Sequence, residues 1–252
     1  MSDKPKMIIP DSGMLMTPRS RRDILKLMAM GGSVVLLPSM LAACSNDDNG
    51  GGTVVTGPGT GAALTIDFAK GDFAVLQFAY ALEQLEADFY TKVMAASSAG
   101  TTNLTAADKA ILQDIKYHEV LHREYFKVAL GTTYGFTITT TYPNLNFNDR
   151  TAVLATAKAL EDTGVKAYNG AAQYIASTDY LLAAGKIVSV EARHASAIAD
   201  LIAPNTNAFA PQTFDDVARP ATIAGIAQGF IVQKLGFANA PTTFVPGPNG
   251  VV

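Results

Sequence analysis

Two short motifs in the sequence place a histidine three residues after a glutamate. They are Glu119-x-x-His122 and Glu191-x-x-His194, and they use two of the three histidines in the chain. Residues three apart on a helix share a face, so each motif would present a carboxylate and an imidazole side by side. Because the neighbouring residues are mostly apolar, we expect both pairs to point into the protein interior.

The first motif also lies within the stretch HEVLH, residues 118–122, which reads H-E-x-x-H. That pattern is a zinc-peptidase signature, with His118 and His122 as ligands and Glu119 as general base. It needs a third ligand, and the chain lacks the longer HExxHxxGxxH pattern that would supply one. We therefore favour Glu119 as a metal ligand and keep the zinc metalloprotease as an alternative. In the favoured interpretation, His118 lies on the helix surface or next to a ligand.

The two motifs belong to a pattern that occurs twice along the chain. Glu83 is followed seven residues later by Tyr90, and Glu161 is followed seven residues later by Tyr168. One Glu-x-x-His motif comes after each of these pairs. Glu86 lies one turn from Glu83 and is an alternative to it, although the spacing to the tyrosine favours Glu83. A buried carboxylate is costly unless it is paired or bound to a metal, so we expect these carboxylates either to be paired or to bind a metal.

Helical periodicity predicts the segments that position these residues. Asp72 is a candidate N-cap for the first segment, and Thr105 with Asp108 resembles a capping box at the start of the second. Gly164 and Gly170 weaken the third segment, so we expect close packing against them. The four segments are 72–97, 105–130, 149–176 and 178–202.

The connections between the segments predict how the helices are joined. The first pair and the second pair each have a short connection, whereas residues 131–148 form a long, threonine-rich crossover with Pro143. Two antiparallel helix pairs with one long crossover make an all-α four-helix bundle. The chain after the bundle, 204–252, is an extension in which 221–235 has the pattern of a short fifth helix and the last residues look irregular.

The ligand plan and the crossover together resemble the ferritin-like domain family found in exported bacterial proteins and in plant desiccation-related proteins. The resemblance covers about residues 70–203 and is clearest in LEQLEADFY and VEARHASAI. By this resemblance, Glu119 and Glu191 would bridge two metal ions, and Tyr90 and Tyr168 would hydrogen-bond ligand carboxylates. The implied ligands are Glu83, Glu119, His122, Glu161, Glu191 and His194.

The same resemblance implies a centre of two Fe or two Mn ions, since oxygen-rich ligation with one imidazole per metal suits either. The reaction would act on Fe(II), O2 or peroxide, as in a ferroxidase, a peroxidase or a catalase-like oxidoreductase. The alternative is a metal-free helical scaffold for envelope or stress protection, so whether the chain is an enzyme stays open. The sequence determines neither the identity of the metal nor the oligomeric state.

The N-terminus has the features of an export signal. The stretch from Ser20 to Lys26 resembles a twin-arginine motif, an apolar run follows, and Leu41-Ala42-Ala43-Cys44 resembles a lipobox. We expect a signal peptide over 1–43, a lipid on Cys44 and a flexible tether over 44–69. An uncleaved membrane anchor is the alternative. Either way the folded part would lie outside the cytoplasm, in the cell envelope or periplasm.

Composition limits the partners. The formal net charge is −3 and no long basic block is present, so nucleic-acid binding has little electrostatic support. Cys44 is the only cysteine, which excludes a disulfide within the chain and a rubredoxin-type electron site. A peroxidase reaction would therefore need an external electron donor.

Overall fold

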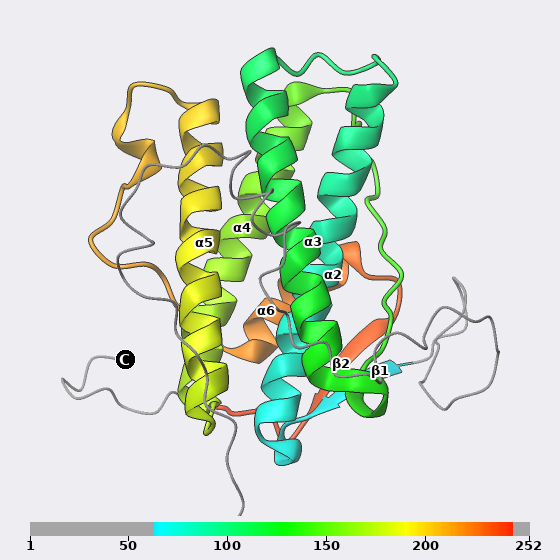
Figure 1. The fold of residues 1–252 in the computed structure, drawn as a ribbon, viewed down its shortest axis with the longest axis vertical. Helices are drawn as coiled ribbons and strands as arrows, with labels where there is room; N and C mark the ends of the chain where they lie inside the picture. Colours follow the sequence, from blue (N-terminus) through cyan, green and yellow to red (C-terminus); the bar gives the residue numbers. More distant parts are fainter. Residues whose placement is uncertain (1–62, 244–252) are drawn as a thin grey trace, which may run out of the picture. The chain divides into compact units, whose positions relative to one another are not determined.

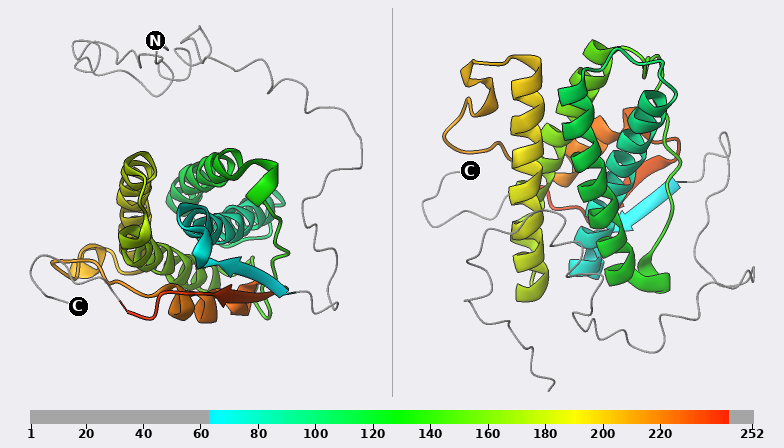
Figure 2. Two further views of the ribbon diagram at one scale, coloured as in Figure 1. Left: turned by 90° about the horizontal axis from the view of Figure 1, so that it is seen from below. Right: turned by 45° about the horizontal axis from the view of Figure 1, so that its top comes forward.

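The computed structural model describes residues 63–243 of the chain, and four long helices dominate this part. They form two antiparallel pairs, α2 with α3 and α4 with α5, which lie side by side when viewed along the helix axes (Figures 1 and 2). The all-α prediction is confirmed, and each predicted segment corresponds to one helix. The bounds are Asp72–Ser98 for α2, Ala106–Tyr134 for α3, Arg150–Ala171 for α4 and Thr178–Ile202 for α5.

Side-chain caps fix where three of these helices begin. Thr105 and Asp108 form the predicted capping box at the start of α3. Asp149 and Ser177 accept backbone N–H groups at the starts of α4 and α5. The predicted cap at Asp72 is wrong, because Gly71, with φ of 60°, occupies that position.

Asp72 is instead the first residue of α2, and it links two parts of the bundle. Its carboxylate accepts hydrogen bonds from the backbone N–H groups of Ala176 and Ser177, at 2.7 and 2.9 Å. Those two residues form the turn before α5. The start of α2 is therefore joined to the connection between α4 and α5.

The crossover that follows α3 contacts α2 on its way to α4. Gly131 has φ of 57° and kinks the last turn of α3, which continues to Tyr134. The chain then runs beside α2 to the start of α4 (Figure 1). Tyr142 of the crossover donates a hydrogen bond to the backbone oxygen of Leu85, and the N–H of Ile138 donates to Gln84.

A small parallel sheet and a short helix complete the described part, and both lie along one side of the bundle (Figure 2). Strand β1, Ala63–Asp67, pairs with strand β2, Lys234–Ala238. Residues 63–67 are therefore a strand, although the tether was predicted to extend to residue 69. Helix α6 is Pro220–Ala227, so the predicted helix over 221–235 ends earlier, and β2 follows it.

The close packing predicted at two glycines of α4 is confirmed. A Cβ atom on Gly170 would lie 1.8 Å from the backbone oxygen of Ala218, and one on Gly164 would lie 3.1 Å from a carboxylate oxygen of Glu86. Glycine is thus the residue that lets the extension and the neighbouring glutamate approach α4.

None of the helices between residues 63 and 243 is long and apolar enough to cross a membrane. The predicted signal peptide, Cys44 and most of the tether lie outside the described residues.

Candidate metal centre

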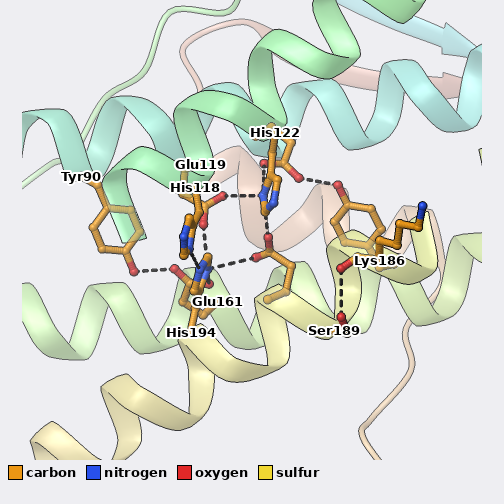
Figure 3. Close-up of polar contacts among 11 residues, drawn as sticks. Tyr90, His118, Glu119, His122, Glu161, Lys186, Ser189 and His194 are labelled. Atoms are coloured by element: carbon orange, nitrogen blue, oxygen red, sulfur yellow. Dashed lines mark hydrogen bonds and ion pairs between the residues drawn. The ribbon is translucent and has the colours of Figure 1, made fainter. Parts of the chain in front are cut away.

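Six side chains from the four long helices converge in the middle of the bundle. Figure 3 shows Glu119, His122, Glu161 and His194 pointing toward one another. The four carboxylates are fully buried, and His194 is 4% exposed. The six are Glu83 from α2, Glu119 and His122 from α3, Glu161 from α4, and Glu191 and His194 from α5. The structure thus brings together all six residues that the sequence pattern predicted as ligands.

The six side chains form two overlapping groups of four. One group is Glu83, Glu119, His122 and Glu191, and the other is Glu119, Glu161, Glu191 and His194. Within each group, one ligand atom per residue lies within 4.8 Å of the others. Glu119 and Glu191 belong to both groups, so each can offer one oxygen to either side. The carboxylates of Glu119 and Glu191 therefore stand between the two groups of potential ligands.

Each histidine faces the carboxylates of its own group through Nδ1. Nδ1 of His122 lies 3.0 Å from an oxygen of Glu191 and 3.4 Å from an oxygen of Glu119. Nδ1 of His194 lies 2.8 Å from Glu119 and 3.3 Å from Glu161. Both imidazoles are therefore placed to give one nitrogen to the space between the carboxylates.

Atoms of the cluster lack hydrogen-bond partners although they are buried. Nδ1 of both histidines and at least one oxygen of every carboxylate make no hydrogen bond of acceptable geometry. Buried polar groups are normally satisfied, and orphaned groups of this kind call for an ion or a proton. The donor set, carboxylate oxygens with one imidazole on each side, fits iron or manganese.

Two tyrosines hydrogen-bond the carboxylates of Glu83 and Glu161, the two glutamates that belong to one group each. The hydroxyl of Tyr90 on α2 donates to an oxygen of Glu161 on α4 at 2.5 Å, and the hydroxyl of Tyr168 on α4 donates to Glu83 on α2. Burial raises the pKa values of both tyrosines well above their usual value, so both are neutral donors. The predicted hydrogen bonds to carboxylates are present, and each one joins the two helix pairs.

Burial and the neighbouring charges set the protonation of the cluster. Burial raises the pKa of Glu83 to about 7, and it also raises the pKa values of Glu161 and Glu191. Burial alone would also raise the pKa of Glu119, but contacts with His122 and His194 lower it to about 2. Burial lowers the pKa values of the two histidines, but the neighbouring carboxylates have a larger, opposite effect. The pKa of His122 is raised to about 12 and that of His194 to about 10. Without metal, the cluster therefore holds protons that a metal ion would displace.

Glu86 lies beside the cluster and belongs to neither group of potential ligands. It is 3% exposed. Burial, and to a smaller extent the nearby charge of Glu191, raise the pKa of Glu86 well above its usual value. The groups contain Glu83, so the geometry favours Glu83 over Glu86. Gly164 of α4 packs against the carboxylate of Glu86, and the sequence pattern offered Glu86 only as an alternative to Glu83.

His118 contacts the centre from outside. Its side chain is more exposed than those of the cluster, and Nδ1 lies 2.8 Å from Nε2 of His194, with the two rings stacked at 5.1 Å. Neither group of potential ligands contains His118. This position agrees with the expectation that His118 lies next to a ligand, and it gives no support to the HExxH interpretation.

The fold and the cluster define a class: a four-helix bundle with a carboxylate and histidine site at its centre. A model of the ferritin-like domain matches residues 71–204, which is more than half of the chain. The chain belongs to the ferritin-like domain family. No curated protein matches it.

Proposed function

We propose that the chain binds two iron or two manganese ions between its four long helices and uses them in redox chemistry. The observation that carries this proposal is that Glu119 and Glu191 belong to both groups of potential ligands. Two separate mononuclear sites would not need shared carboxylates. In this arrangement Glu83 with His122 and Glu161 with His194 would each complete one side.

The residues of the chain prepare the site for such ions. Glu83 and Glu161 would each bind on one side only, and the hydroxyls of Tyr168 and Tyr90 hold their carboxylates in place. The surrounding core is apolar, which keeps water away from the carboxylates. Two carboxylate-bridged metal ions supply a centre that can exchange two electrons with Fe(II), O2 or peroxide.

The proposed reactions are those of a ferroxidase, a peroxidase or a catalase-like oxidoreductase. The chain has one cysteine, so it carries no pair of thiols that could return electrons to the centre. A peroxidase reaction would therefore use an electron donor from outside the chain.

We also propose that the protein is exported and held at the membrane by a lipid on Cys44. The support is in the sequence: an Arg21-Arg22 pair, an apolar run and the small residues that precede Cys44. In this proposal the domain from residue 63 onward works in the cell envelope.

Metal content measured by mass spectrometry tests the main proposal. Protein purified without added metal is expected to carry about two iron or manganese ions per chain, the number set by two groups of ligands. The double variant Glu119→Ala/Glu191→Ala should lose them, because it removes both shared carboxylates. The control is Glu124→Ala/Asp200→Ala, which removes more exposed carboxylates from the same two helices and should keep the metal.

The other outcomes favour the alternatives. The close contacts of His122 and His194 with carboxylates already offset part of the buried charge, which is the observation in favour of a metal-free scaffold. Absence of metal in the wild type, with equal folding of the double variant, would support that scaffold. One zinc ion per chain would instead support the zinc metalloprotease.

A further inference from the structure

An apolar pocket lies in the bundle between the metal centre and the turn that joins α4 to α5. Its deep side is formed by α2, where Leu76, Phe78 and Leu82 are all less than 5% exposed. Tyr125 of α3 also lines the pocket and is 38% exposed. The pocket is therefore closed at α2 and reaches the surface near Tyr125.

The pocket and the metal centre share a wall. Tyr168 lines the pocket, and its hydroxyl donates a hydrogen bond to Glu83. Phe126, which also lines the pocket, lies one helical turn after His122, and Leu82 directly precedes Glu83. A molecule in the pocket would thus be separated from the cluster by the ring of Tyr168.

The size of the pocket suits a very small guest. Its volume is about 30 Å³. On the same measure one water molecule needs roughly 10–15 Å³, so the pocket has room for a diatomic molecule and not for an organic substrate.

The chemistry of the walls selects against polar guests. The lining residues are alanine, aliphatic or aromatic, and although Tyr125, Tyr168 and Tyr180 each carry a hydroxyl, the surface that they turn to the pocket is almost wholly apolar. The hydroxyl of Tyr168 already donates to Glu83 and has no second hydrogen to give. A peroxide molecule would lose its hydrogen bonds to water on entering, whereas an apolar molecule loses none. Because apolar walls offer water no hydrogen bonds, the pocket favours xenon or other small apolar guests.

We propose that this pocket is a binding site for dioxygen, placed beside the metal centre behind Tyr168. The binding of dioxygen is inferred from the pocket alone. The use of that dioxygen by the metal centre rests on the proposed function. The inference assigns the pocket to O2 and leaves any reaction with peroxide independent of it. It also assigns a role to the end of the bundle next to the α4–α5 turn.

Xenon is the probe for the binding site, because it is apolar, similar in size to dioxygen and independent of any metal. Metal-free wild-type protein is expected to bind xenon in the pocket, as seen in crystals under xenon pressure and as a shift of the xenon NMR signal. Ala171→Leu on α4 and Ala184→Leu on α5 would each fill the pocket and should abolish the binding. The control is Ala183→Leu, because Ala183 neighbours Ala184 without lining the pocket.

Dioxygen kinetics of the metal-loaded protein test the use of the site. In the two filled variants the KM for O2 should rise about fourfold, the contribution of burying one methylene-sized apolar guest. The KM for peroxide and the metal content should not change. If one variant fails to fold, the other still tests the proposal, since the two alanines lie on different helices.

The failures are distinguishable. Wild-type protein without xenon in the pocket, or filled variants with an unchanged KM for O2, would overturn this proposal and leave the metal centre intact. Wild-type protein purified without metal would overturn the redox function whatever the xenon result, and with it the role of the pocket in supplying dioxygen.

Discussion

Glu119 differs from the other carboxylates of the cluster in the charge it carries before any metal arrives. Its pKa is lowered to about 2, whereas the pKa of Glu83 is raised to about 7 and those of His122 and His194 to about 12 and about 10. Near neutral pH, Glu119 is thus ready to bind a cation. Glu83 is then partly protonated and the two histidines are protonated, so a cation that binds there would have to displace those protons.

Metal binding should therefore become tighter as pH rises. Groups with raised pKa values keep their protons at low pH, so an acidic solution opposes binding. Between pH 6 and pH 8 we expect the affinity for Mn(II) to increase about tenfold per pH unit for each proton displaced. Calorimetric titrations in buffers of different ionisation enthalpy would count those protons. An affinity that is flat over this range, with no proton released, would contradict the expectation.

Gly164 controls how closely α4 approaches two carboxylates. A Cβ atom there would lie 3.1 Å from an oxygen of Glu86 and 3.3 Å from an oxygen of Glu191. Gly164→Ala should therefore shift Glu191 and weaken metal binding roughly 10-fold, the usual size of such an indirect effect. Metal titration of the purified variant measures this.

Gly185→Ala is the matched control, since nothing lies within 4 Å of a Cβ atom at that position of α5. It should leave metal binding unchanged and stabilise the helix by up to about 1 kcal/mol. Equal metal affinity in the two alanine variants would show that the approach of α4 is not needed for the site.

The six residues of the cluster could be predicted from the sequence because the order of Glu, Tyr and Glu-x-x-His occurs twice and resembles the ligand set of ferritin-like domains. Glu86 and His118 could not be placed in the same way. Gly164 of α4 packs against the carboxylate of Glu86, and the contact of His118 depends on how its ring meets His194. Those are distances between helices, which spacing along one helix does not determine.

At the scale of the elements, the helix ends were predictable where a side chain caps them. Thr105 with Asp108 marks the start of α3 in the sequence and in the structure. Asp72 is also of a residue type that often caps helices, but its carboxylate accepts hydrogen bonds from the turn before α5. Only the folded chain brings that turn close to Asp72. The strands β1 and β2 were missed, because each is five residues long and its partner is far away in the sequence.

Packing of the extension on α4 should depend on Gly170. A Cβ atom there would lie 1.8 Å from the backbone oxygen of Ala218, whose N–H donates to the oxygen of Lys166 at 3.1 Å. Backbone cannot rotate away as a side chain does, so Gly170→Ala should lower the free energy of unfolding by about 1–3 kcal/mol. Urea unfolding beside Gly185→Ala measures the difference. An unchanged or higher free energy of unfolding would show that the extension moves without cost.

At the scale of the whole molecule, the proposed lipid anchor can be tested by where the chain is found. Cys44→Ser removes the sulfur that would carry the lipid, so the protein should move from the membrane fraction to the soluble envelope fraction. Arg21→Lys with Arg22→Lys removes the arginine pair and should keep the chain in the cytoplasm. Cell fractionation with a tagged chain measures both. Cys44→Ser protein that stays with the membrane would favour an uncleaved anchor.

The pairing of β1 with β2 has a consequence for the order of folding. Helices α2 to α5 are complete by Ile202, and each helix pair forms from neighbouring segments. Ala63 pairs with Lys234, so the strands close a loop of about 170 residues at an entropic cost of roughly 5 kcal/mol. We expect this closure to come last, after the bundle exists to receive Phe237 against Phe78. The newly made chain would thus form the helix bundle with its central cluster first and pair β1 with β2 afterwards.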